Sequence, residues 1–188
     1  MLIKEYQETW VNDYNRLKKI FEENISTKDI KIEHIGSTSI KGLAAKPIID
    51  IDVVYEKSES FKEIKQSLEK LGYCHNGNQG IIGREVFKRN KKKENYIVLD
   101  LIQHHLYVCQ INSFELRRHL SFRDYLRENK KEREEYAKLK YKIAELTNQN
   151  KKEYAKQKEV MAKEFIESII EKSIRTQHRL NARSKYPN

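Results

Sequence analysis

The 188-residue sequence predicts an α+β fold, with a small mixed β-sheet followed by a helical C-terminal half. Two observations predict this arrangement. β-branched, strand-forming segments are confined to the first 110 or so positions, and after Asn112 apolar residues recur at spacings of three and four. No proline interrupts residues 48–186. We expect one domain over residues 1–172 and a basic, flexible tail over 173–188.

The front half begins with an amphipathic helix. Residues 7–24 carry apolar side chains three and four positions apart, which predicts that helix. A short strand is expected at 31–35. Pro47 opens a second strand over 48–55, because the run Ile-Ile-Asp-Ile-Asp-Val-Val-Tyr is strongly strand-forming.

A helix is expected next, with a buried stripe from Phe61 to Leu71. Ser58 and Ser60 stand where a cap belongs, and Gly72 terminates the helix.

Two further strands are expected at 84–89 and 96–109, paired as a hairpin around a polar loop at 90–95. The second run is long, so it is expected to contain a bend or bulge. Apolar stripes then predict three helices, over 114–126, 136–146 and 154–170.

Composition limits the possible classes of protein. No apolar run of about 18 residues occurs, so no membrane span is expected, and the N-terminus lacks a signal-peptide pattern. We interpret Cys74 and Cys109, the two cysteines, as buried free thiols of a cytoplasmic protein.

The formal net charge is +10, and the basic residues are unevenly placed. Five lysines or arginines lie in residues 88–93, and five more in 172–188. Such runs are ordinarily solvated faces. They could also attract a polyanion, such as a nucleoside triphosphate or a nucleic acid.

The aspartates of the second strand are the most specific feature. Alternate side chains of a strand share a face, so Asp50 and Asp52 project together, with Cα atoms roughly 6.5 Å apart. Two such carboxylates can hold Mg²⁺ or Mn²⁺. The alternative is an ordinary strand edge with two solvated aspartates.

Upstream, Gly36 and Ser37 follow a strand end and open a short helix-like turn. Glycine lets a backbone approach phosphate closely, and N–H groups at such a turn can point at phosphate oxygens. Alone, the pair indicates a plain turn, but the aspartates downstream favour a phosphate site.

The Gly-Ser pair, a twelve-residue gap and Asp-x-Asp resemble the nucleotidyltransferase superfamily, the polymerase-beta-like fold. The longer run from His34 to Ile51 resembles the GrpB family, also called UPF0157. Trp10, the run from His104 to Val108, the run from Arg118 to Arg127 and the run from Tyr136 to Lys140 extend this resemblance, which covers roughly residues 5–170.

The resemblance implies a nucleotidyltransferase sheet on which Gly36 and Ser37 cradle a triphosphate and Asp50 and Asp52 bind metal. Such enzymes usually add a third carboxylate on a neighbouring strand. Asp100 and His105 are the candidates. A regular strand puts them on opposite faces, and we favour His105, as a base near neutral pH. The alternative for His105 is a structural role in the sheet.

Three basic residues are further candidates for binding the nucleotide: Lys46, Arg84 and Arg123. An exposed lysine is as good an interpretation of Lys46. Arg123 could equally belong to a salt-bridged helix pair with Asp124.

Together these features predict a metal-dependent nucleotidyltransferase that moves a nucleoside monophosphate group to an unidentified hydroxyl acceptor. The alternative is a nucleotide- or RNA-binding module without catalysis. Hydrolysis of a phosphoester at the same site is a third possibility.

Overall fold

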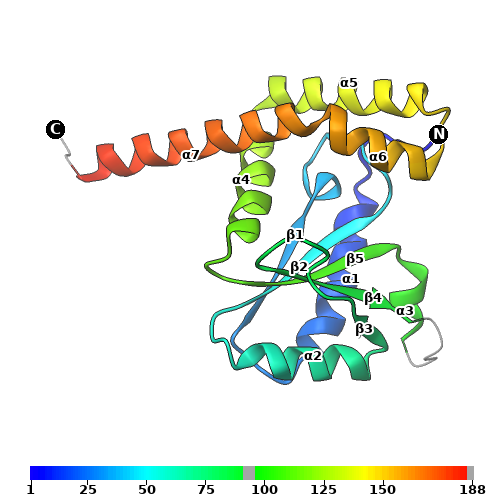
Figure 1. Ribbon diagram of the computed structural model, residues 1–188, viewed down its shortest axis with the longest axis vertical. Helices are drawn as coiled ribbons and strands as arrows, with labels where there is room; N and C mark the ends of the chain where they lie inside the picture. The colour runs from blue at the N-terminus through cyan, green and yellow to red at the C-terminus, as the bar shows by residue number, and fades with distance from the viewer. Residues whose placement is uncertain (91–95, 186–188) are drawn as a thin grey trace.

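The computed structural model describes residues 1–90 and 96–185, with side chains to residue 177. In this part of the chain a five-stranded mixed sheet has the order β1-β2-β5-β4-β3 (Figure 1). The strands are β1 (Ile30–Ile35), β2 (Ile49–Tyr55), β3 (Tyr73–His75), β4 (Arg84–Arg89) and β5 (His104–Gln110). The α+β class and the strands near residues 31–35, 48–55 and 84–89 are confirmed.

The register places β2 in the interior of the sheet, between β1 and β5. β2 runs antiparallel to β1 and parallel to β5, while β4 is antiparallel to both β5 and β3. Because β2 has a partner on each side, both its edges are hydrogen-bonded. Its side chains are therefore divided only between the two faces of the sheet.

One face of the sheet is apolar and packs against α1 (Thr9–Asn24) and α2 (Ser60–Lys70). Ile49, Ile51 and Val53 of β2 point into this core. The helices contribute Trp10, Leu17, Phe21, Ile64 and Leu68. Burial of these side chains is the main stabilising term for this layer.

The other face carries the polar residues of β2 and is flanked by the C-terminal helices (Figure 1). These are α4 (Phe114–Glu128), α5 (Lys130–Leu146), α6 (Lys151–Met161) and α7 (Lys163–Lys185). A second apolar cluster joins α4, α5 and α7 to the loop between β1 and β2 through Leu126, Tyr136, Ile169, Ile40 and Leu43.

Several sequence expectations are corrected. Residues 96–109 do not form one long strand, because α3 (Ile97–Leu101) precedes β5. The expected helix over 154–170 is two helices that meet near Ala162. No serine side chain caps α2, and its N-cap residue is Glu59. Cys109 is buried, but Cys74 is exposed.

The expected hairpin of β4 and β5 is antiparallel as predicted, but its loop falls largely on residues 91–95, outside the described residues. Part of the basic run at 88–93 lies there too. α7 is helical to Lys185, so the first thirteen positions of the expected tail, 173–185, continue a helix. Among the described residues, no helix is long and apolar enough to cross a membrane.

Candidate functional site

The polar face of the sheet brings together residues from three strands. Asp50 pairs with His105 and Asp52 with Tyr107 across the parallel β2–β5 ladder. On the other side, Asp52 is opposite Glu33 of β1. Residues paired across a ladder share a face, so the alternation predicted for Asp50 and Asp52 places both toward the C-terminal helices.

Asp50 lies at the open part of this face. Its Oδ1 is 2.8 Å from His105 Nδ1, and the two side chains are 27% and 54% exposed. Gly36 stands directly against Asp50, because a Cβ built on Gly36 would lie 2.2 Å from Asp50 Oδ2. Gly36 also has a φ of 68°, a left-handed conformation that glycine adopts without strain. Glycine is therefore required both for the turn and for the space that the carboxylate occupies.

The turn after Gly36 is a 3₁₀ helix, η1 (Ser37–Ser39), and it is anchored from inside. His34 Nε2 lies 3.1 Å from Thr38 Oγ1, which donates to the Ile48 carbonyl at 3.2 Å. Tyr14 stacks on the His34 ring. Burial lowers the pKa of His34 to about 4, so this histidine is neutral at physiological pH.

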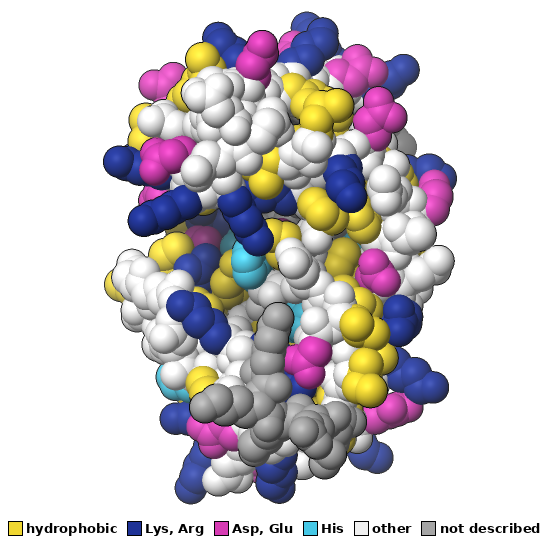
Figure 2. All heavy atoms as spheres, turned by 90° about the vertical axis from the view of Figure 1, so that its right-hand side faces the viewer, with side chains coloured by type: hydrophobic (Ala, Val, Ile, Leu, Met, Phe, Trp, Pro, Cys, Tyr) yellow, Lys and Arg dark blue, Asp and Glu magenta, His cyan; other side chains and the backbone are white. Residues whose placement is uncertain are grey.

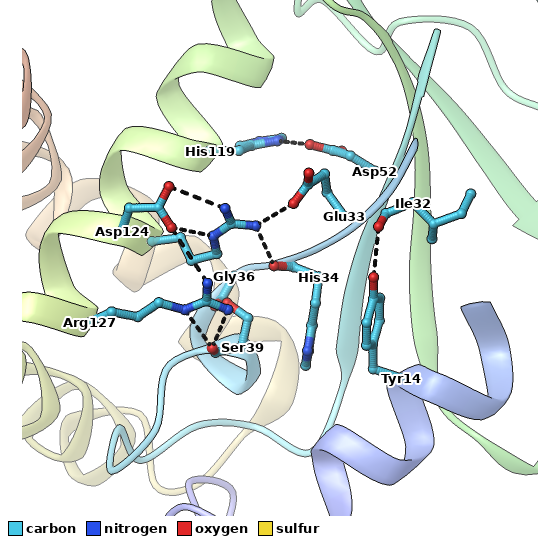
Figure 3. Close-up of polar contacts among 11 residues, drawn as sticks. Tyr14, Ile32, Glu33, His34, Gly36, Ser39, Asp52, His119, Asp124 and Arg127 are labelled. Atoms are coloured by element: carbon cyan, nitrogen blue, oxygen red, sulfur yellow. Dashed lines mark hydrogen bonds and ion pairs between the residues drawn. The ribbon is translucent and has the colours of Figure 1, made fainter. Parts of the chain in front are cut away.

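Two arginines of α4 hold the same turn from outside (Figure 3). Arg127 donates to the Ser39 carbonyl from Nε and Nη2, at 3.1 and 2.9 Å. Arg123 donates to the His34 carbonyl at 3.1 Å and to Glu33 Oε2 at 2.6 Å, and pairs with Asp124. Arg123 is thus committed to the protein's own oxygens, as the salt-bridged alternative for it anticipates.

Asp52 is fully buried, and His119 of α4 reaches it (Figure 3). His119 Nδ1 lies 2.7 Å from Asp52 Oδ2, and its Nε2 lies 3.3 Å from Glu115 Oε1. Burial disfavours the charged imidazole, but the two carboxylates outweigh it and raise the pKa of His119 to about 9. The Cys109 thiol faces Asp52 Oδ1 at 3.8 Å.

A cavity of about 410 Å³ opens beside Asp50 and is lined by lysines. Figure 2 shows this side of the molecule hollowed across its middle, with Lys and Arg side chains along the hollow and histidine within it. The lining includes Ser37, Asp50 and His105, and the lysines are Lys46, Lys140, Lys151 and Lys158.

The lysines of this cavity experience one another's charge. Lys46 Nζ lies 4.1 Å from the Tyr154 ring centroid. Burial, followed by Lys158 and Lys151, lowers the pKa of Lys46 to about 8. Lys140 is buried behind them, donates to the Ala44 carbonyl, and has its pKa held well below the ordinary value by burial. Tyr136 and Asp50, by contrast, raise the pKa of Lys158. An anion near Lys46 would relieve the repulsion that Lys158 and Lys151 exert on its ammonium group.

A second cavity, of about 280 Å³, lies on the α4 and α7 side of Asp50. It shares Ser37, Asp50, Tyr107 and Lys158 with the first cavity. Its remaining lining is mixed, with the apolar residues Ile35, Phe122, Ile166 and Ile170 and the charged residues Glu115, Arg118 and His119. Asp50 therefore borders two chambers of different chemical character.

The structure brings together most of the predicted site residues. Gly36, Ser37, Lys46, Asp50 and His105 border the cavities or stand against Asp50. By contrast, Arg84 borders neither cavity. It pairs with Cys109 across the β4–β5 ladder and so lies on the polar face, with its guanidinium 4.7 Å from the Tyr107 ring centroid and its buried Nε lacking a hydrogen-bond partner in the described part of the chain.

Asp100 is placed away from the site. It lies on α3 and forms two hydrogen bonds of 2.9 Å with Arg89. His105, not Asp100, stands beside Asp50. The long-strand expectation fails here because α3 interrupts it, and a helix turns Asp100 toward β4 instead of the polar face.

Sequence reasoning placed Arg123 of α4 at the site but missed Glu115 of the same helix and the cavity lysines of α6. Glu115 and His119 lie one helical turn apart and both face Asp52's end of β2. The four-residue spacing of Glu115 and His119 is visible in the sequence. Nothing in the sequence, however, indicates which strand that face meets. Lys158 fits the terminal-helix motif of the GrpB family but was not assigned to the site, and Lys151 carried no local signal among so many lysines.

The donor set fits a metal ion at one of the two aspartates. Mg²⁺ is commonly bound through one or two carboxylates together with substrate phosphates and water. Asp50 is partly exposed and borders both cavities, so it meets this requirement. Asp52 borders neither cavity. Within the described residues, no three His, Cys, Asp or Glu side chains are grouped as a metal site.

The chain is similar to known proteins in its family and in its fold. The model of the GrpB protein family matches residues 1–172. The glutamate-rich protein GrpB of Alkalihalophilus pseudofirmus is 32% identical over 171 residues, covering 90% of this chain and 94% of that protein. The UPF0157 protein YqkA of Bacillus subtilis is 36% identical over 143 residues, which are 74% of this chain but 38% of YqkA, so the chain spans well under half of that relative.

Among solved structures, the conserved protein GrpB from Enterococcus faecalis has a TM-score of 0.75 at 32% identity, with 93% of this chain and 98% of that chain covered. Cid1 in complex with its short product ApU has a TM-score of 0.52 at 12% identity and covers 75% of this chain and 42% of Cid1. Another Cid1 poly(U) polymerase structure, with MgGTP bound, has the same TM-score at 11% identity. At these identities the likeness establishes a nucleotidyltransferase-like fold.

Proposed function

The chain belongs to the GrpB protein family, and we propose that its lysine-lined cavity binds a nucleoside triphosphate. We further propose that the protein transfers its nucleotidyl group to a hydroxyl acceptor. The observation that carries the proposal is that four lysines line one cavity together with Ser37 and Asp50. In the lining of this cavity, Asp50 is the only carboxylate among the described residues, so the chamber is suited to a polyanion. The fold shared with Cid1 agrees with this chemistry.

The two cavities suggest how the substrates divide. The triphosphate would occupy the lysine-lined chamber, with phosphate oxygens near Ser37 and Lys158. The acceptor would enter the second chamber, whose apolar wall suits an organic group. Asp50 and Lys158 border both chambers, so the reacting phosphorus would lie between them. Holding two reactants in this way contributes to the rate by itself.

Divalent metal, when bound with the nucleotide at Asp50, would neutralise phosphate charge. Lys46, Lys151 and Lys158 would add fixed positive charge around the leaving pyrophosphate. Asp50 holds His105 through Nδ1, which leaves Nε2 free to accept a proton. His105 lines the lysine-lined chamber and not the second one, so the acceptor hydroxyl would have to reach past Asp50 to meet it. The acceptor oxygen would bond to the α-phosphorus as the bond to pyrophosphate breaks.

Isothermal calorimetry with Mg-ATP and the other Mg-NTPs tests the binding step. We expect a triphosphate to bind the wild type and Lys158→Gln to weaken that binding at least tenfold. Lys156→Gln is the matched control, because Lys156 lies on the same helix, is exposed and borders neither cavity. Failure of every triphosphate to bind the wild type would rule the proposal out.

A binding module without catalysis is the second candidate, and the burial of Asp52 favours it. The basic runs would then serve nucleic acid or nucleotide binding. The two functions differ in one measurement. Label from an α-phosphate-labelled triphosphate should reach an acceptor, with release of pyrophosphate, only if the protein is an enzyme. Release of nucleoside monophosphate without labelled acceptor would indicate hydrolysis.

A further inference from the structure

Asp52 is satisfied entirely by the protein, although it lies two residues from Asp50 on the same face. Its side chain is 0% exposed. One carboxylate oxygen lies 2.7 Å from His119 Nδ1, and the other faces the Cys109 thiol at 3.8 Å. No face of this carboxylate is turned to either cavity. A buried carboxylate is costly unless a positive group and hydrogen bonds compensate it.

His119 lies between two carboxylates, and this position defines its chemical form. Each ring nitrogen points at a carboxylate oxygen, of Asp52 at 2.7 Å and of Glu115 at 3.3 Å. A neutral imidazole has one N–H, so one nitrogen would present its lone pair to a carboxylate. Only the imidazolium donates to both. The positive charge beside Asp52 is therefore a built-in part of the fold.

Glu115 is also held from its other side. Arg118 Nε lies 3.4 Å from Glu115 Oε2, and the same guanidinium binds Glu167 of α7 at 2.6 and 2.7 Å. The chain Asp52–His119–Glu115–Arg118–Glu167 alternates in sign from β2 of the sheet to α7. It leaves no uncompensated carboxylate at Asp52 for a divalent ion to neutralise.

We propose that the His119 ring, held between Asp52 and Glu115, occupies the cation position of Asp52, so that a divalent ion in this cleft is held by Asp50 and not by the aspartate pair. His119 is thus a positioning residue. Its positive charge compensates the Asp52 carboxylate, and its contact with Asp52 joins α4 to β2. The inference deepens the proposed function and rests on it for the metal at Asp50, but the state of Asp52 can be measured without nucleotide.

The experiment is a titration of nucleotide-free protein with Mn²⁺, followed by electron paramagnetic resonance. Wild type, His119→Ala and the double variant His119→Ala with Asp52→Asn are compared. Removing the imidazole uncovers the carboxylates of Asp52 and Glu115. We therefore expect His119→Ala to bind Mn²⁺ at least tenfold more tightly than the wild type, and the added Asp52→Asn to abolish that gain.

Two results would overturn the inference: His119→Ala binds Mn²⁺ no more tightly than the wild type, or Asp52→Asn alone weakens Mn²⁺ binding by the wild type tenfold. Circular dichroism establishes that each variant is folded. Should His119→Ala not fold, Asp52→Asn decides the question, because it preserves shape and should change Mn²⁺ affinity less than twofold. Loss of triphosphate binding by the wild type would defeat the proposed function and leave this result standing.

Discussion

Asp50 and Asp52 occupy one face of one strand and each pairs with a histidine, yet they differ in exposure and in the element that supplies that histidine. Asp50 is partly exposed, borders two cavities and is paired with a histidine of the neighbouring strand that is itself 54% exposed. Asp52 is fully buried and paired with a histidine of a packed helix. A strand pattern specifies the face of a residue, but the helix above it specifies whether that residue meets solvent or protein.

The largest expected effect is a difference in the free energy of unfolding between variants of the two histidine partners, His119 and His105. His119→Leu would leave the buried Asp52 charge unpaired and should lower the free energy of unfolding by about 3–5 kcal/mol. His105→Leu removes an exposed pair and should cost about 1 kcal/mol or less. Urea denaturation measures both. Equal losses would show that Asp52 is less dependent on its partner than its burial implies.

The pH dependence of stability should follow His119. Its pKa rises from about 6.5 in the unfolded chain to about 9 in the folded protein. The stabilisation is therefore fully present below pH 6.5 and is lost as the pH rises through 9, by up to about 3 kcal/mol.

Lys46 acts in the opposite direction above pH 8, because its folded pKa is lowered to about 8. The measurement is therefore the difference between wild type and His119→Gln, from urea denaturation at pH 6.5 to 9. A difference that does not shrink across this range would contradict the assignment.

The space beside Asp50 predicts an intermediate effect. Gly36→Ala would push a Cβ against the Asp50 carboxylate and strain a backbone with φ of 68°. We expect a loss of about 1–3 kcal/mol together with weaker triphosphate binding. Gly77→Ala is the control, because Gly77 has a φ of 63° but nothing within 4 Å of its added Cβ. If both variants behave alike, backbone strain alone is responsible.

The smallest effect is expected at the arginines that hold η1. Arg127 is 42% exposed, so Arg127→Lys should cost less than about 1 kcal/mol. Arg123 is 11% exposed and serves Glu33, Asp124 and the His34 carbonyl, so Arg123→Lys should cost more. Thermal unfolding of both variants ranks them. The reverse order would indicate that the Ser39 carbonyl is the more important anchor.

Local patterns were sufficient for much of the fold. The apolar periodicity of residues 7–24 and the β-branched run at 48–55 predicted α1 and β2, since each element buries one face against the core. They failed at 96–109, where the run Ile-Val-Leu-Asp-Leu suits a short helix as well as a strand. Packing decided between these, and with it the position of Asp100.

Which residues share the polar face of β2 could be predicted from the sequence, because strand alternation is a local geometric rule, and so could the turn at Gly36 and Ser37. Tertiary structure alone decided that α4 brings His119 to Asp52, that α6 brings Lys158 toward Ser37, and that Arg123 serves the protein's own carboxylates. The hydrogen bonds of His119 to Asp52 and of Arg123 to Glu33 join residues 67 and 90 positions apart, and Lys158 lines the same two cavities as Ser37. No local pattern encodes these contacts, because they depend on how whole layers pack.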